Sequence, residues 1–159
     1  QTKSNRYKEI AVISCDIDFF KVINDNHGHN YGDKILEKVA LELKNHTKSH
    51  FKNERLVARW GGEEFIIALF DSNPKQARLL ANTLREVIHN NEYQVNGERF
   101  SISLSFGVAH HDVTTLKIED IINESDKALY HAKSHGRNQV SCQSDLDKRS
   151  LNPAKENTI

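Results

Sequence analysis

The hydrophobic and polar positions along the chain form short apolar runs that alternate with amphipathic stretches. Residues 8–15 are mostly apolar and rich in β-branched side chains, which predicts a buried strand. Residues 24–32 are rich in asparagine and glycine, which predicts a loop. From Asp33 onward, apolar residues recur at helical spacing with lysine and glutamate between them, so a helix is expected to begin there.

Two strands separated by glycines follow this helix. Residues 55–60 and 63–70 flank Gly61-Gly62, and a glycine pair suits a two-residue hairpin turn with positive φ. Asn73 and Pro74 predict the N-cap and the first position of a second helix. The remaining expected elements are a strand over 99–109, a helix over 117–134 and a short strand over 138–142.

The order of these elements predicts an α/β (α+β) fold in which helices flank a mixed central sheet. We expect the folded domain to span residues 8–143, after a linker remnant over 1–7. Residues 144–159 are polar and lack periodicity, so a disordered tail is expected there.

Composition narrows the class of protein. The 159 residues suffice for one domain, and 37% apolar with 28% charged residues is typical of a soluble globular fold. Lys plus Arg and Asp plus Glu each total 22, so the chain lacks the basic excess typical of nucleic-acid partners. No stretch is apolar enough for a membrane helix, and two cysteines are too few for a disulfide framework. These features favour a cytoplasmic domain without membrane contact, and the lack of any methionine indicates an excised or processed chain.

Acidic residues occur where two of the expected strands end or begin. Asp16 and Asp18 follow the first apolar run, and Glu63 and Glu64 follow the glycine pair. If the two strands are neighbours, Asp16 and Glu63 converge and offer the hard oxygen ligands that suit Mg²⁺. Solvated acids at strand ends would show the same spacing, so this pattern alone leaves both interpretations open.

The segment Arg59-Trp60-Gly61-Gly62-Glu63-Glu64-Phe65 resembles the signature of the GGDEF family, the diguanylate cyclases, in its GGEEF spelling. The resemblance extends over residues 8–142 and implies a fold similar to the nucleotidyl cyclases and the polymerase palm. The other matching segments, in family order and spacing, are Asp16-Ile17-Asp18-Phe19-Phe20-Lys21, Ile23-Asn24-Asp25, Gly28-His29, Gly32-Asp33, Ser105-Phe106-Gly107-Val108-Ala109, the run from Asp126 to Lys133, and Gly136-Arg137-Asn138.

The resemblance implies a reaction and its partners. Two GTP molecules would condense to cyclic di-GMP with release of two pyrophosphates, through attack of a 3′-hydroxyl on an α-phosphate assisted by Mg²⁺ or Mn²⁺. Each domain would hold one GTP, so turnover would require a homodimer, and an upstream sensor or regulatory domain is expected in the full protein. The alternative is a regulatory module that binds GTP and does not catalyse.

The resemblance also implies a role for each matching residue. The metal ligands would be Asp16, the Ile17 carbonyl, Glu63 and Glu64, and the catalytic residues would be Glu63, Glu64 and Lys21. Asn24 and Asp33 would read guanine while Leu36 packs against the base, and Asp33 would also cap the helix that it opens. The triphosphate would be bound by Lys21, Lys133, Arg137 and the backbone N–H groups of Phe19 and Phe20.

Two features depart from the family pattern. Lys52 and Arg55 occupy the positions of an inhibitory Arg-x-x-Asp product site, so the missing carboxylate predicts that feedback binding is lost or weakened. The usual leading helix segment does not appear before Lys8. The histidine pairs His27/His29 and His131/His135 lack a third metal ligand and are interpreted as structural or surface residues.

Overall fold

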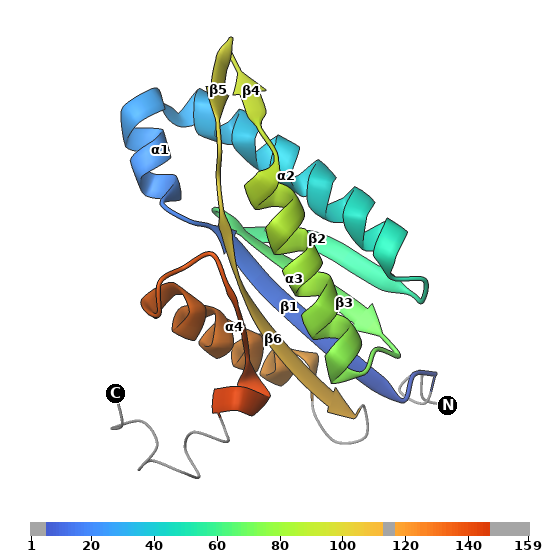
Figure 1. The fold of residues 1–159 in the computed structure, drawn as a ribbon. Coiled ribbons are helices and arrows are strands. Elements are labelled where there is room, and N and C mark those ends of the chain that lie inside the picture. Colours follow the sequence, from blue (N-terminus) through green and yellow to red (C-terminus); the bar gives the residue numbers. More distant parts are fainter. Residues whose placement is uncertain (1–5, 113–116, 147–159) are drawn as a thin grey trace.

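The structure is a computed structural model that describes residues 6–112 and 117–146, with a five-stranded sheet at its centre (Figure 1). The central strand β1 (Glu9–Ile17) pairs antiparallel with β3 (Glu64–Phe70) and with β6 (Leu104–Asp112). The edges are β2 (Arg55–Gly61), antiparallel to β3, and β7 (Val140–Cys142), parallel to β6. The sheet is therefore mixed, as predicted.

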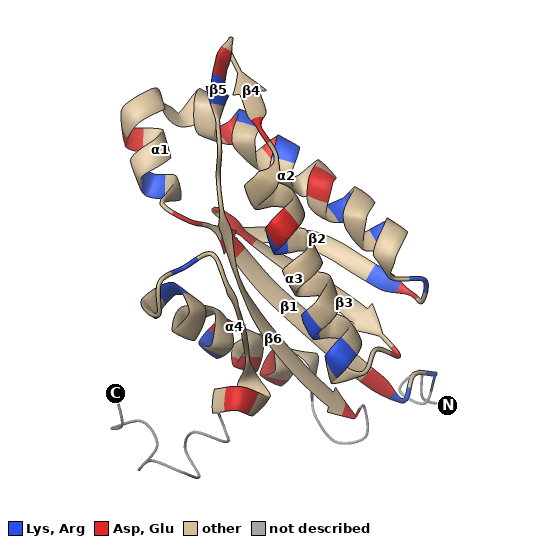
Figure 2. Ribbon diagram, viewed as in Figure 1, with Lys and Arg blue, Asp and Glu red and all other residues tan. Residues whose placement is uncertain are grey.

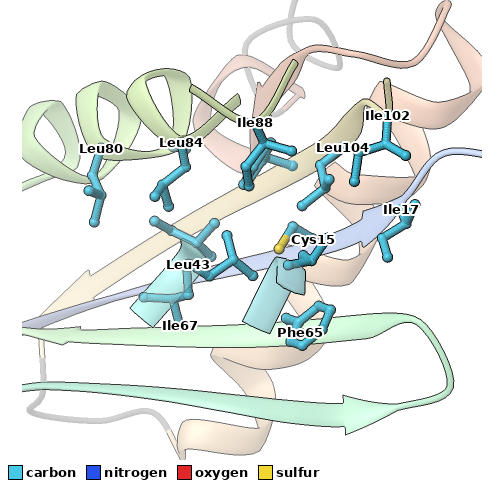
Figure 3. Close-up of a cluster of buried hydrophobic side chains, with 14 of the residues drawn as sticks. Cys15, Ile17, Leu43, Phe65, Ile67, Leu80, Leu84, Ile88, Ile102 and Leu104 are labelled. Atoms are coloured by element: carbon cyan, nitrogen blue, oxygen red, sulfur yellow. The ribbon is translucent and has the colours of Figure 1, made fainter. Parts of the chain in front are cut away.

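Helices cover both faces of this sheet. On one face lie α2 (His29–His50) and α3 (Pro74–Asn90), and Figure 3 shows Leu80, Leu84 and Ile88 of α3 in a buried cluster with Cys15 of β1. On the other face lies α4 (Ile118–Ser134), whose residues Ile121 and Ile122 form a second buried cluster with Ile10 and Val12. Because both faces are covered, β1 is apolar along most of its length, which explains its continuous apolar run.

The segment between β1 and α2 differs from the expected loop. It contains the helix α1 (Phe20–His27), and α2 already begins at His29, so only Gly28 with φ 89° interrupts the two helices. Most of the asparagines and histidines that suggested a loop are exposed on these helices, while Phe20 and Tyr31 are buried in the core. Core packing thus overrides weak local propensity here. Asp33 lies in the second turn of α2, so the interpretation of this residue as a helix cap was wrong.

The strand expected over 99–109 also differs. It begins only at Leu104, and a separate hairpin of β4 (Tyr93–Val95) and β5 (Glu98–Phe100) precedes it. The turn of this hairpin is Asn96-Gly97, with φ of 52° and 82°. An Asn-Gly pair is a strong hairpin signal, and it could have located this element in the sequence.

The β2–β3 turn is shifted by one residue from the predicted position. A bulge between Arg59 and Gly61 extends β2 through Gly61, so the turn consists of Gly62 and Glu63. Only Gly62 has positive φ, at 52°, and the Arg59 Nε donates a hydrogen bond to the Gly62 carbonyl at 2.8 Å. The predicted start of α3 is confirmed, because Asn73 caps it and Pro74 is its first residue.

The chain ends were expected to be a linker remnant and a tail. In the described part, the Tyr7 ring lies 4.7 Å from the Phe70 ring, and residues 143–146 form a helical turn in which Asp145 pairs with Arg78. Residues 1–5 and 147–159 of the expected linker and tail lie outside the described residues. None of the described helices is long and apolar enough to cross a membrane.

Candidate functional site

The site is built around Asp16, near the end of β1. In the sheet register Asp16 lies opposite Glu64 of β3, so both side chains lie on the face covered by α4. The Lys133 Nζ of α4 donates a hydrogen bond to Asp16 Oδ2 at 2.7 Å. Sheet pairing and one helix therefore gather residues from three distant parts of the sequence. Figure 2 shows the acidic ends of β1 and β3 beside the basic segment that follows α4.

These carboxyls interact strongly with each other. Burial raises the pKa of Asp16 above its ordinary value, although Lys133 opposes the shift, and Glu63 and Asp18 raise it further. Burial together with the neighbouring carboxyl of Asp126 raises the pKa of Glu64 to about 8. The ionised form of these carboxyls is therefore disfavoured in the protein alone, because Lys133 does not offset their burial and mutual repulsion.

Two oxygen atoms of this cluster have no protein partner. Asp16 Oδ1 and Asp126 Oδ1 are buried and accept no hydrogen bond within the described structure. A buried acceptor left in this state costs about 1–3 kcal/mol unless a ligand satisfies it. Because carboxylates are the oxygen ligands that Mg²⁺ and Mn²⁺ prefer, these residues fit a divalent cation.

The tip of the β2–β3 hairpin is open. A methyl group built on Gly61 or on Gly62 would meet no atom within 4 Å. Glu63 lies in this turn, half-buried, and its charge acts on Asp16. The hairpin therefore presents bare backbone and a carboxylate next to the Asp16 cluster, and leaves space there for a bulky ligand.

A second group of predicted residues lies at the junction of β1, α1 and the loop after α4. Phe19 adopts φ 59° immediately before α1, and the residue is 60% exposed. The Arg137 guanidinium lies 4.7 Å from the centre of that ring. A left-handed conformation costs a non-glycine residue free energy, so the surrounding structure holds Phe19 in a strained position at the free N–H groups of α1.

Asp18 holds this junction together, a role that the sequence did not reveal. The hydroxyls of Ser103 and Ser105 each donate to its carboxylate at 2.6 Å, and the Asn138 backbone N–H donates at 3.0 Å. Asp18 is 3% exposed and is therefore a structural acceptor in this arrangement. The alternation of Ser with apolar residues over 101–105 was the only signal of these partners in the sequence.

The predicted guanine residues lie on α1 and α2. Asn24 Oδ1 is buried without a hydrogen-bond partner, and Gly32 leaves room for it because an added methyl would lie 1.9 Å away. Asp33 is exposed, while Leu36 is 4% exposed and belongs to the core. Leu36 therefore offers little surface to a base. Lys21 is exposed on α1, and no described carboxylate pairs with it.

Lys52 and Arg55, the positions of the expected inhibitory site, do not belong to the group of residues around Asp16. Lys52 lines a cavity of about 420 Å³ between the end of α2 and α3, together with Gln76 and Thr83. Arg55 donates a hydrogen bond to the Asn53 carbonyl at 3.3 Å. None of the described residues that line this cavity is acidic, in agreement with the missing carboxylate.

Comparison with known proteins identifies the family of this chain. The family model described as diguanylate cyclase, GGDEF domain, matches residues 1–139. Diguanylate cyclase A of Treponema denticola is 34% identical over 140 residues, which cover 88% of this chain and 37% of that protein. Diguanylate cyclase DosC of Escherichia coli is 38% identical over 136 residues, covering 82% of this chain and 28% of that protein. The chain thus spans well under half the length of these curated relatives.

Solved structures give the same result for the fold. The active GGEEF domain of a diguanylate cyclase from Vibrio cholerae superposes with a TM-score of 0.72 at 35% identity, covering 86% of this chain and 83% of that one. The GGDEF domain of PA1120 from Pseudomonas aeruginosa superposes with a TM-score of 0.78 at 28% identity, covering 91% and 82%. The palm-like fold expected from the sequence is confirmed. Since the family model covers most of its length, the chain belongs to the GGDEF-domain family of diguanylate cyclases.

Proposed function

We propose that this domain condenses two molecules of GTP into cyclic di-GMP. Two phosphodiester bonds form between a 3′-oxygen and an α-phosphorus, and two α–β phosphoanhydride bonds break to release two pyrophosphates. The observation that supports this proposal most is the unsatisfied buried oxygen of Asp16, with Glu63 and Glu64 beside it and Lys133 on its other oxygen.

The carboxylate cluster is the part of the site that would bind metal. Asp16, Glu63 and Glu64, with the backbone carbonyl of Ile17, would hold Mg²⁺ or Mn²⁺, which lowers the pKa of an attacking hydroxyl and neutralises a triphosphate. Lys133 holds Asp16 at one oxygen and leaves the other oxygen available. An ammonium carries three donors, so Lys133 can also donate to a phosphate oxygen.

The triphosphate would bind between α1 and the loop after α4. The free N–H groups at the start of α1, from Phe19 and Phe20, form an anion site of the kind found at helix N-termini. Lys21 of α1 and Arg137, which lies over the Phe19 ring, would add positive charge to it. This charge stabilises the pyrophosphate as negative charge develops on it.

Asn24 and Asp33 would bind the guanine. The carboxylate of Asp33 accepts from N1–H and the 2-amino group, which adenine does not offer in that arrangement. The Asn24 Oδ1 is buried against Gly32 without a hydrogen-bond partner, so its side chain would turn outward to accept from the same base. Together these two side chains favour GTP over ATP.

Turnover would require two copies of the domain, because each copy holds a single GTP and the product contains two guanylates. The full protein would place this domain in the cytoplasm, where GTP is available, next to a sensor or regulatory domain. Product binding at Lys52 and Arg55 would be lost or weakened, because Arg55 stands at the position of the aspartate that would accept from guanine.

Product analysis by chromatography tests the proposal. Concentrated protein is incubated with GTP and Mg²⁺, alongside Glu63→Gln and the matched surface variant Glu37→Gln, whose side chain is exposed on α2. Cyclic di-GMP from the wild type and from Glu37→Gln, but not from Glu63→Gln, is the expected result. GTP that binds but stays unconverted at high protein concentration would instead identify the second candidate, a regulatory GTP-binding module.

A further inference from the structure

A second cluster of metal-ligating side chains lies at the opposite end of the sheet from Asp16. It consists of Glu9, the first residue of β1, with His110 and Asp112 at the end of β6. One ligand atom from each of these residues lies within 4.8 Å of the other two. Figure 2 shows the acidic start of β1 beside the acidic tip of β6.

The sheet register explains why these three side chains meet. Glu9 is directly opposite Asp112 in the antiparallel pair, and His110 precedes Asp112 by two residues, so all three lie on the same face. Two like charges directly opposite each other destabilise a strand pair unless a positive charge lies between them. Among the residues that the structure describes, no lysine or arginine pairs with Glu9 or Asp112.

His110 contacts one of these two carboxylates directly. Its Nε2 lies 2.7 Å from Glu9 Oε1. A neutral imidazole in this position can equally direct a nitrogen lone pair at a cation that the two carboxylates share. The cluster therefore offers one nitrogen and two carboxylate ligands to a single ion.

We propose that Glu9, His110 and Asp112 form a binding site for a transition-metal dication of the Zn²⁺ type. Zn²⁺ accepts histidine nitrogen and carboxylate oxygen, and three protein ligands leave its fourth position for water. Mg²⁺ prefers oxygen ligands alone, which distinguishes this site from the all-oxygen cluster at Asp16.

The site is accessible and bridges two strands. The Glu9 and His110 side chains are 32% and 19% exposed, and Asp112 is exposed, so an ion can enter without opening the core. A bound ion would connect the first residue of β1 to the last residue of β6. Because such a site exists only in the folded chain, Zn²⁺ would raise thermal stability by mass action.

The neighbouring histidine provides a matched control. His111 lies on the other face of β6, where its Nε2 contacts Glu124 of α4. His111→Ala removes an imidazole one residue away from the site without removing a ligand. Asp16→Asn controls for Zn²⁺ binding at the catalytic cluster.

Isothermal titration with ZnCl₂, in buffer containing millimolar Mg²⁺, tests this site. We expect one Zn²⁺ per chain with a micromolar Kd in the wild type, in His111→Ala and in Asp16→Asn. His110→Ala should weaken binding at least tenfold, and Zn²⁺ should raise the Tm of every variant that still binds it. Asp112→Asn, at an exposed position that tolerates substitution, should weaken binding as well and serves if His110→Ala does not fold.

Three results would overturn the proposal. The first is the absence of Zn²⁺ binding by the wild type, and the second is binding by His110→Ala and Asp112→Asn that is as tight as that of the wild type. The third is loss of binding in Asp16→Asn, which would locate the ion at the catalytic cluster. None of these measurements depends on cyclase activity, so the site can fail while the proposed function stands.

Discussion

Lys133 donates to only one oxygen of Asp16, and the other oxygen is buried without a partner opposite Glu64 in the sheet. Lys133 thus satisfies the Oδ2 atom of Asp16 and leaves the Oδ1 atom free to bind a ligand. This one-sided pairing is the feature of the cluster that supports the proposed cation, because a buried carboxylate oxygen without a partner is costly.

Removal of the Asp16 carboxylate should abolish catalysis and leave the fold intact. In Asp16→Asn the amide keeps the size of the side chain but is a poor metal ligand, so we expect cyclic di-GMP formation to fall by at least about 100-fold. Product chromatography and circular dichroism measure the two effects. Activity near the wild-type level in a folded Asp16→Asn protein would refute the assignment.

Stability without metal should fall as pH rises through the range in which Glu64 ionises. Its pKa in the folded chain is raised from 4.5 to about 8, chiefly by burial, so the folded state holds a proton that the unfolded state has lost. The contribution of Glu64 to folding stability is fully present below the pKa that Glu64 has in the unfolded chain. It is lost as the pH rises toward 8, the pKa in the folded chain. Urea unfolding in EDTA should therefore give a larger free energy at pH 5.5 than at pH 8.5. Glu64→Gln should reduce this difference, whereas an unchanged difference would show that other groups cause it.

Gly107 should not tolerate even a methyl group. A Cβ at this position of β6 would lie 2.1 Å from both the Leu129 amide nitrogen and the Ser125 carbonyl oxygen of α4. Gly107→Ala must displace α4, at a cost of about 1–3 kcal/mol or more. Since α4 carries Lys133, we expect lower activity as well as a lower midpoint in urea. An unchanged midpoint would mean that α4 packs less closely on β6.

Gly61→Ala should leave stability nearly unchanged and weaken GTP binding. The added methyl meets no protein atom within 4 Å, and the φ of Gly61 is not positive, so the free energy of unfolding should change by less than about 0.5 kcal/mol. GTP binding should weaken severalfold, because the methyl occupies space next to Glu63 that the nucleotide would use. Calorimetry with GTP and Mn²⁺ measures this directly. Unchanged GTP affinity would place the nucleotide away from the hairpin tip.

Cyclic di-GMP should inhibit this domain weakly. Lys52 and Arg55 provide positive charge but no carboxylate to accept from guanine, so titrated product should bind far more weakly than in a domain with an intact Arg-x-x-Asp site. Lys52→Ala should leave the inhibition by product unchanged. Tight product binding that Lys52→Ala removes would contradict this prediction.

Much of the fold could be predicted because strand signals in this chain are local. The buried run of β1 and the Asn73-Pro74 cap each depend on a few adjacent residues, and the structure bears them out. The alternation over 99–109 predicted a strand correctly only from Leu104 onward. The helix α1 could not be predicted in the same way. Its exposed polar residues resemble a loop, and only contacts of Phe20 and Tyr31 with the distant core make it helical.

The same distinction applies to the site. The end of β1 and the start of β3 could be predicted from the sequence. The proximity of Asp16 to Glu63 and Glu64 follows if these two strands are neighbours, as the structure shows. The effect of Asp126 on Glu64 depends on how α4 rotates over the sheet, which no sequence spacing specifies. The bonds from Ser103 and Ser105 to Asp18 likewise depend on the position of β6 beside β1.

The central position of β1 also determines when the site can form during synthesis. Both of its sheet partners come later in the chain, and β6 ends only at Asp112. An emerging chain therefore carries an apolar strand with an unpaired edge until most of the domain has left the ribosome. Asp16 would acquire Lys133, and Asp18 would acquire Asn138, only at the last stage. A nascent chain that stops before α4 would thus hold the acids of the Asp16 cluster without the helix that organises them.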